Sequence, residues 1–458
     1  MAGGKYSLEP VAVEKVSTPY REIKTSLPVP ESIELLDNLS KHEPISMQGQ
    51  PPIIWDRAEG WQVYDAYGNK WLDWSCGVLI TNAGHGHPHI VTAMAAIVNK
   101  PLLTTYGFPH AGRTQLVRML AERAPDGLDK VFLLSTGSEA TENCIKLAKT
   151  WGLLQGGPEK NVFISFENGF HGRTLGAQLA GGLPGQKDWV GDVGKGFAQV
   201  PFPDGYKNPN TEFSLFVETL EAKGINPHHV AGVMSETYQG VGPDFMPNEY
   251  AQALRRWCDD HGALLIFDEV QAGFGRTGTY WGFEHYGVVP DLIACGKGIS
   301  GSLPLSAVIG RDEIMNRYPP GSMTSTHSAN PVAVACAIAN LEVIDRENLV
   351  DKAAVNGRLL AKRLHEVQTA YPARLGCLQT RGMVAGIQVV QPNTRTPDSQ
   401  TAVRINERCF QKGLLMFAPV GIGGECLKIA PPLSTPPEAI EEGVEVFREV
   451  CDEVLSTE

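Results

Sequence analysis

Lys297 is the residue of this sequence whose setting most clearly indicates chemistry. It stands between Gly296 and Gly298, directly after the apolar run Leu292–Cys295, in a segment without a neighbouring charge. Most lysines are solvated surface residues, and that reading remains open for Lys297. A lysine desolvated at this point would have a lowered pKa and could attack a carbonyl carbon. The segment therefore makes Lys297 a candidate Schiff-base lysine.

An acidic residue ends a second apolar run. Asp268 follows residues 263–267, which have the composition of a buried strand. In open α/β sheets, ligands bind beyond the carboxyl ends of the strands. A carboxylate there could pair with the pyridine nitrogen of pyridoxal phosphate (PLP) and keep that ring an electron sink. The alternative is a capping role at a turn or helix.

A small polar turn lies between a third apolar run and a helical pattern. Its residues are Ser135, Thr136, Gly137 and Ser138. Backbone N–H groups and hydroxyls at a helix N-terminus suit a phosphate. An ordinary N-cap has the same sequence, so that reading stays open as well. A PLP site needs a Schiff-base lysine, an acid for the ring nitrogen and a phosphate-binding turn. The occurrence of all three in one chain is far less expected by chance than that of any one.

Two other motifs suggest competing chemistries. His85 and His87 follow the strand-like run Gly77–Ile80, and an HxH pair at a strand end can bind zinc. The alternative is a glycine-rich turn with solvated histidines, because no second cluster of ligands stands out. Residues 273–278 match G-x-G-x-x-G, but they neither end a strand nor open a helix, as a dinucleotide site requires. We therefore expect no metal and no dinucleotide.

The elements that must position these residues alternate along the chain. Short apolar runs separated by amphipathic stretches predict βαβ units and a mostly parallel sheet. The expected strands are 131–134, 162–166, 230–235, 263–267, 292–295 and 306–309. The expected helices are 114–124, 140–154, 248–261 and 331–346.

Both ends of the chain are expected to build a smaller α+β domain. The polar N-terminal segment has a short helical stretch near 31–39, and residues 61–74 have the alternation of a hairpin. The tail predicts helices 352–371 and 437–454 with strands 384–390 and 427–430 between them. The expected division is 1–84 for the arm and part of the small domain, 85–346 for the large domain, and 347–458 for the rest of the small domain.

Composition excludes several classes. With 458 residues, of which 42% are apolar, the chain is long enough for two packing units. Its net charge of −12 argues against a general binder of nucleic acid or anionic membranes. There is neither an apolar run of spanning length nor a continuous apolar stretch near the N-terminus, so we expect no membrane segment and no signal peptide. The nine cysteines show no CxxC spacing, which is typical of free thiols in the cytoplasm.

At this point the sequence resembles the class III, or ω-amino acid type, aminotransferases of the fold-type-I PLP superfamily. The resemblance covers about residues 50 to 450. It rests on LLIFDEVQAGFGRTG, which begins at Leu264, followed by PDLIACGKGISGSLPLSAVIG, which begins at Pro290. It implies an α/β enzyme with a large PLP domain, whose mostly parallel sheet is flanked by helices, and a small α+β domain.

The resemblance also implies roles for individual residues. Lys297 would carry PLP as a Schiff base and move the substrate proton. Asp268 would pair with the pyridine nitrogen, and Gln271 would bond near the phenolic oxygen. Phe170, before His171, would stack on the ring. The remaining cofactor contacts implied are Ser135, Thr136, Gly137, Ser138, His171, Glu236 and Thr326, with Thr326 reaching the phosphate of the neighbouring subunit.

Two departures from the family pattern concern the substrate. Lys428 stands where many relatives have an arginine that grips a carboxylate, and lysine lacks the planar fork. Val241 stands where some relatives have a glutamate that masks this arginine. Thr237 also replaces the proline of the family's Glu-Pro-x-Gln-Gly segment. By their order along the chain, His85, Val78, Leu79 and Tyr106 are expected in the pocket wall.

The sequence thus predicts a cytoplasmic PLP-dependent aminotransferase. It would move an amino group from an amine, an ω-amino acid or a small amino acid to a 2-oxo acid, in a homodimer with shared active sites or a tetramer. A racemase, decarboxylase or lyase on the same fold is the alternative, since the cofactor does the hard chemistry. A zinc hydrolase using His85 and His87 is a more distant one.

Overall fold

Six of the expected runs are strands of one seven-stranded sheet in the computed structural model, which describes residues 6–456 apart from the side chains of residues 192 and 193. The strand order is β6-β14-β13-β12-β9-β7-β8. All pairings are parallel except those of β14, which runs antiparallel to both of its neighbours. The bounds are β6 Lys130–Leu134, β14 Ser306–Gly310, β13 Leu292–Cys295, β12 Leu264–Asp268, β9 Val230–Glu236, β7 Val162–Phe166 and β8 Phe197–Val200.

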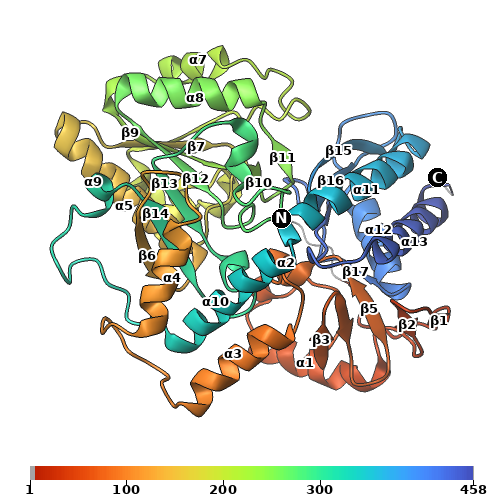
Figure 1. Ribbon diagram of the computed structural model, residues 1–458. Helices are drawn as coiled ribbons and strands as arrows, with labels where there is room; N and C mark the ends of the chain where they lie inside the picture. The colour runs from red at the N-terminus through yellow and green to blue at the C-terminus, as the bar shows by residue number, and fades with distance from the viewer. Residues whose placement is uncertain (1–5, 457–458) are drawn as a thin grey trace. The chain divides into compact units, whose positions relative to one another are not determined.

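Helices cover both faces of this sheet (Figure 1). Adjacent residues of a strand point to opposite faces. In β7, Phe163 packs in a core with residues of α5 (Gly137–Gly156), whereas Phe166 contacts Tyr250 of α8 (Asn248–His261). The short helix α7 (Ser214–Ala222) packs on the edge strand β8. This confirms the expected α/β architecture with a mostly parallel sheet between helices.

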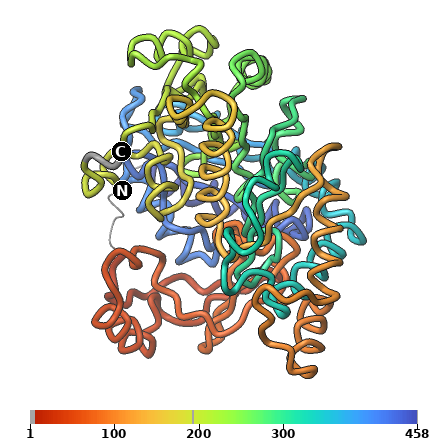
Figure 2. Tube along the Cα trace, turned by 90° about the vertical axis from the view of Figure 1, so that its left-hand side faces the viewer, coloured from red at the N-terminus to blue at the C-terminus, as the bar shows by residue number. Residues whose placement is uncertain are grey.

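A second group of helices accompanies the sheet. The helix α10 (Pro331–Arg346) packs against α3 (Pro88–Asn99) and α4 (Ala111–Ala121). Figure 2 shows α3 in orange beside α10 in teal. Expectation placed α4 at 114–124, but it begins three residues earlier, where the His110 imidazole caps it by accepting from the Arg113 N–H.

The chain divides into two compact units, of which the sheet and helices above form the one from Pro88 to Val350. The other takes the chain up to His87 and from Asp351 onward. Its first sheet contains the N-terminal strands β1 to β5 and β17, and its second contains β15, β16 and β18. The bounds are β1 Val16–Ser17, β2 Glu22–Ile23, β3 Arg57–Glu59, β4 Gln62–Tyr64, β5 Lys70–Asp73, β15 Leu375–Arg381, β16 Val384–Val389, β17 Leu414–Leu415 and β18 Cys426–Ile429.

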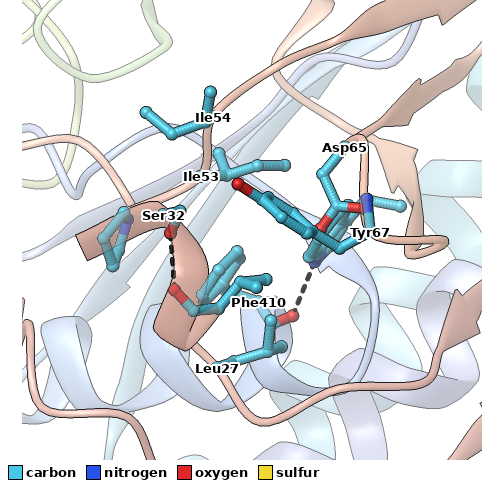
Figure 3. A pocket seen from close by; sticks show the side chains of 10 residues that line it. Leu27, Ser32, Ile53, Ile54, Asp65, Tyr67 and Phe410 are labelled. Atoms are coloured by element: carbon cyan, nitrogen blue, oxygen red, sulfur yellow. Dashed lines mark hydrogen bonds between the residues drawn. The ribbon is translucent and has the colours of Figure 1, made fainter. Parts of the chain in front are cut away.

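The two chain ends are joined within this second unit by β17, which pairs parallel with β5. Trp71 of β5 stacks on Phe410 at 5.5 Å between ring centroids and donates a 2.9 Å hydrogen bond to its carbonyl. Figure 3 shows Phe410 beside a hollow with mostly apolar walls, which Trp71 also lines and which leaves no room for a water molecule. The helices are α1 Ile33–His42, α12 Ser399–Gln411, α13 Pro437–Leu455 and α11 Leu349–Ala370, which begins just before the boundary.

One local expectation was wrong. Residues 77–80 were expected to form a strand. They instead lie in the turn α2 (Cys76–Leu79) and its C-cap Ile80. Cys76, Gly77, Val78 and Leu79 all have φ between 51° and 63°. Apolar composition alone does not distinguish a strand from a buried turn. The Ser75 side chain opens the turn by accepting from the Gly77 N–H. None of the helices within residues 6–456 is both long and apolar enough to cross a membrane.

Candidate active site

A cavity of about 320 Å³ lies in the Pro88–Val350 unit, around the carboxyl ends of β9 and β12. That volume is at the lower end of the range for small-molecule sites. Nine of the residues proposed from sequence line it together, although they come from five separate segments of the chain. These residues are Thr136, Gly137, Ser138, Phe170, His171, Glu236, Asp268, Gln271 and Lys297.

Asp268 is held in one orientation by two donors. Its Oδ1 accepts from the Val270 N–H at 3.0 Å, and its Oδ2 lies 2.8 Å from Nδ1 of His171. Both side chains are almost fully buried. Burial disfavours the imidazolium, but the hydrogen bond and charge of Asp268 outweigh this effect and raise the pKa of His171. Asp268 therefore lines the cavity with its carboxylate held by two neighbouring groups.

Lys297 follows β13 in a tight turn, η7 (Lys297–Ile299), and has a φ of 44°. Such a φ is unfavourable for a residue with a side chain, and strain of this kind concentrates at functional sites. The Asn340 amide of α10 fixes the turn by donating to the carbonyls of Gly298 and Ile299 at 2.8 and 3.3 Å. Burial lowers the pKa of Lys297, although the charges of Asp268 and Glu236 partly oppose this shift. A larger fraction of its amine is thus uncharged and nucleophilic.

Glu236 is a second buried carboxylate of the cavity. Its Oε2 accepts from the Phe170 N–H at 2.9 Å and its Oε1 from the Gly240 N–H at 2.8 Å. Burial, with a contribution from Asp268, raises its pKa to about 7 against the opposing charge of His171 and the two backbone bonds. Glu236 can therefore hold or release a proton near neutral pH.

The N-terminus of α5 forms another wall. Thr136 is its N-cap: its hydroxyl accepts from the Glu139 N–H, and the Glu139 carboxylate accepts from the N–H groups of Ser135 and Thr136. The capping role left open from the sequence is thus present, and Ser135 supports the turn without lining the cavity. The first N–H groups of a 20-residue helix remain a favourable place for an anion.

Two glycines keep this wall open. A Cβ on Gly137 would lie 2.9 Å from a methyl group of Val270. A Cβ on Gly172, which has a φ of 123°, would lie 2.2 Å from Oγ of Ser138. Only glycine lets these segments approach so closely.

Three lining residues were not proposed from the sequence: Gly172, Arg173 and Val270. The Arg173 guanidinium lies 5.5 Å from the ring centroid of Phe170, and the backbone N–H of Arg173 donates to Oγ of Ser138 at 3.3 Å. All three could have been predicted from the sequence, because Gly172 and Arg173 lie in the segment of Phe170 and Val270 lies in the segment of Asp268.

Besides Ser135 and His85, five proposed residues do not line this cavity. Thr326 and Tyr106 belong to the same unit and are exposed, and the neighbour Ser325 donates to Glu139 at 3.1 Å. In the other unit, Lys428 is buried in β18 with its amine 5.7 Å from the Phe417 ring. In the turn α2, Val78 is exposed and Leu79 is buried.

The zinc alternative gains no support. His85 is buried, and its Nε2 lies 2.7 Å from Oδ2 of Asp73. Among the side chains that the structure describes, no three or more His, Cys, Asp or Glu are arranged for a metal ion.

Comparison with known proteins decides the family. The model of the class III aminotransferases matches residues 45–451. The chain belongs to the class III aminotransferase family. This aminotransferase is 32% identical to the 5-aminovalerate aminotransferase of Pseudomonas putida over 88% of this chain and 94% of that one. It is 30% identical to the 4-aminobutyrate aminotransferase of Mycobacterium leprae, over 94% and 98% of the two chains.

Solved structures agree with this assignment. An aminotransferase of Bacillus anthracis superposes with a TM-score of 0.83 and 29% identity, over 93% of this chain and 99% of that one. The ornithine aminotransferase of Toxoplasma gondii superposes with a TM-score of 0.83 and 25% identity, over 94% and 97%. The fold is that of the fold-type-I PLP enzymes. None of the comparisons favours a racemase, a decarboxylase or a lyase.

This aminotransferase depends on PLP, as its family does. The cavity fits the group, because it offers an amine with a lowered pKa, a supported carboxylate and a helix N-terminus kept open by glycines. These match the aldehyde, the ring nitrogen and the phosphate of PLP in chemical type.

Proposed function

We propose that this aminotransferase takes its amino group from a donor whose primary amine lies distal to a carboxylate, or from a small amino acid, and passes it to a 2-oxo acid. The observation that carries the proposal is the convergence of Lys297, Asp268 and the N-terminus of α5 on one cavity. Two of the relatives are named for 4-aminobutyrate and 5-aminovalerate, in which the amine is distal to the carboxylate.

The same cavity suggests how PLP would be held. Lys297 would hold it covalently through Nζ, and the Asp268 carboxylate would meet the ring nitrogen. The N–H groups of Gly137 and Ser138 would receive the phosphate. Phe170 and Gln271 would contact the ring. When bound, PLP supplies an electron sink that lets a proton leave the substrate carbon.

The protein's own groups then do the remaining work. The Lys297 amine would take up a proton from the substrate carbon at Nζ and give it up again within the site, as a base with lowered pKa can do at neutral pH. Val270 and His171 both donate to Asp268 and keep its carboxylate in one orientation. Glu236, which interacts electrostatically with Lys297 and Asp268, can take up or release a proton near neutral pH.

We further propose that Lys428 receives the substrate carboxylate. A lysine binds a carboxylate as a point charge and cannot form the bidentate pair of an arginine. This supports a donor range that includes monocarboxylic ω-amino acids and leaves 2-oxoglutarate a weakly held acceptor. Val78, Leu79 and Tyr106 are proposed to line the substrate pocket.

A panel of donors with pyruvate or 2-oxoglutarate as acceptor tests this proposal. We expect 4-aminobutyrate or 5-aminovalerate to be turned over with a kcat/KM at least about tenfold above that of glutamate. Turnover of glutamate at the higher rate would overturn the donor assignment and leave the family assignment intact.

We also propose a cytoplasmic homodimer, or a tetramer made of such dimers, in which Thr326 completes the site of the neighbouring subunit. In each chain, residues 85–346 would form the large domain and the rest the arm and small domain. Mixed dimers test the shared site: co-expressed Lys297→Ala and Thr326→Ala chains should recover activity, because one site of the mixed dimer carries neither change. Recovery would be absent if each chain built its own site.

A further inference from the structure

Glu269, the residue after Asp268, has a fully buried carboxylate that does not line the cavity. Its Oε2 accepts from the Gly282 N–H at 2.6 Å, and its Oε1 accepts from the Phe283 N–H at 3.2 Å. A third donor is the hydroxyl of Thr237, which bonds to the same Oε1. The carboxylate thus joins the end of β12 to the start of η6 (Gly282–Tyr286).

Thr237 is the residue after Glu236, and its side chain is equally buried. In the parallel pairing of β9 with β12, Glu236 stands opposite Asp268. Thr237 and Glu269 therefore each directly follow the last residue of their strand. Their hydrogen bond ties the strand ends together directly behind the two carboxylates of the cavity.

Thr237 is itself fixed by its surroundings. Its carbonyl accepts from the Tyr286 hydroxyl. Its methyl group packs so closely on Gly282 that a Cβ there would lie 2.8 Å from it. The hydroxyl of Thr237 has therefore little freedom to turn away from Glu269.

The bond matters because a buried carboxylate is costly when its donors are removed. Burial and the charge of Asp268 raise the pKa of Glu269 to about 7, whereas the bonds from Thr237, Gly282 and Phe283 oppose that rise. The Tyr286 hydroxyl bonds to the carbonyl of Thr237, and the charge of Glu269 helps to raise the pKa of the Cys295 thiol on β13. Without the Thr237 hydroxyl, the Glu269 carboxylate would lose one of these three donors.

We propose that Thr237 is a positioning residue of the cofactor site: through its bond to Glu269 it holds the ends of β9 and β12 so that Glu236 and Asp268 face the cavity. The inference goes beyond the proposed function, since it does not depend on the donor. It requires only that PLP binds in the cavity.

The test compares Thr237→Val with Thr237→Ser. Valine keeps the shape and the methyl group but cannot donate, and serine keeps the donor but lacks the methyl group. The affinity for PLP is measured by titrating each cofactor-free protein and following the absorbance of bound PLP. We expect Thr237→Val to raise the Kd for PLP by about tenfold, and Thr237→Ser by less than about twofold. Equal losses in the two variants would overturn the proposal in favour of packing by the methyl group.

The pH dependence separates positioning from a general loss of stability. Glu269 is less readily ionised in the folded than in the unfolded chain, so stability that it contributes at low pH is lost as the pH rises through about 7. The loss of folding stability caused by Thr237→Val should therefore be larger at about pH 8 than at about pH 5. A defect in stability that is equal at both pH values, with unchanged affinity for PLP, would contradict the proposal.

Glu269→Gln tests the same bond from its other partner. Glutamine still fills the site but is neutral at every pH. We expect Glu269→Gln alone to weaken PLP binding and to make the later change of Thr237 to Val nearly silent. Additive losses in the double variant would show that the two side chains act independently and would overturn the proposal.

Discussion

Nδ1 of His171 lies 2.8 Å from Oδ2 of Asp268, and both side chains are removed from solvent. Against the effect of burial, the bond to Asp268 raises the pKa of His171, and a protonated imidazole donates through both ring nitrogens. The Thr141 hydroxyl donates to the carbonyl of His171 at 2.7 Å and holds the residue in place. The acid proposed to meet the cofactor ring is therefore supported by groups on two other segments.

Replacing His171 by leucine removes this donor and leaves the Asp268 carboxylate with fewer partners. Loss of a hydrogen bond to a buried charge costs about 1–3 kcal/mol, so kcat/KM should fall by about tenfold to hundredfold. Steady-state kinetics with saturating PLP measure the effect. The control is His365→Leu on the exposed side of α11, which should keep the parent rate. An unchanged rate in His171→Leu would show that Asp268 does not need this support.

Lys297→Ala should abolish turnover while leaving the fold intact. The variant loses both the covalent anchor and the base, and loss of a positioned base alone costs about 10²- to 10⁴-fold. Turnover and the far-ultraviolet circular dichroism spectrum are measured together. Lys362→Ala, on the exposed side of α11, is the matched control. Wild-type rates in Lys297→Ala would refute the assignment.

Gly172→Ala should narrow the cavity beside the N-terminus of α5. The added methyl carbon would lie 2.2 Å from Oγ of Ser138 at a φ of 123°, so the backbone must move. We expect the Kd for PLP to rise by about tenfold or more, which corresponds to ~1.4 kcal/mol. The control is Gly185→Ala, which meets nothing within 4 Å. Equal affinities in the two variants would contradict the proposed phosphate position.

The pH dependence of stability follows from Glu236. Its pKa rises from an ordinary 4.5 to about 7 on folding, so the folded chain holds this proton more tightly than the unfolded chain. Stability from this source is complete below pH 4.5 and is lost as the pH rises through about 7.

Glu236→Gln should reduce that loss. In urea unfolding of the cofactor-free protein, wild type should lose about 1–3 kcal/mol more than the variant between about pH 5 and about pH 8. Glu218→Gln on the exposed face of α7 should behave like wild type. The raised pKa of His171 acts in the same direction and is present in all three proteins. If the free energy of unfolding changes equally with pH in wild type and Glu236→Gln, Glu236 does not contribute to the pH dependence of stability.

The sequence predicts the central strands well because they are short, continuous and apolar, as buried parallel strands must be. It misses β8, which is four residues long and only partly buried, and the helices α3 and α12. It also misses β15, the partner of β16, whose residues are mostly half-buried. Edge elements carry a weaker apolar signal because solvent covers one side of them.

For the candidate site, residue types and order along the chain were sufficient to nominate Lys297, Asp268 and the turn at Gly137. Contacts between distant segments were not predictable. His171 and Asp268 are 97 positions apart, and Thr237 and Glu269 are 32 apart. Thr237 stands out in the sequence only as a departure from the family's segment. Its bond to Glu269 depends on the register of β9 and β12, which no local pattern encodes.

Chemical trapping tests the central claim most directly, namely that Lys297 holds PLP. The PLP-loaded enzyme is treated with borohydride, which makes a lysine–PLP bond permanent, and the digested peptides are identified by mass spectrometry. We predict one modified peptide, the one containing Lys297, and no trapped PLP in Lys297→Ala. PLP fixed to a different lysine, or an unmodified Lys297 in fully loaded enzyme, would contradict the account.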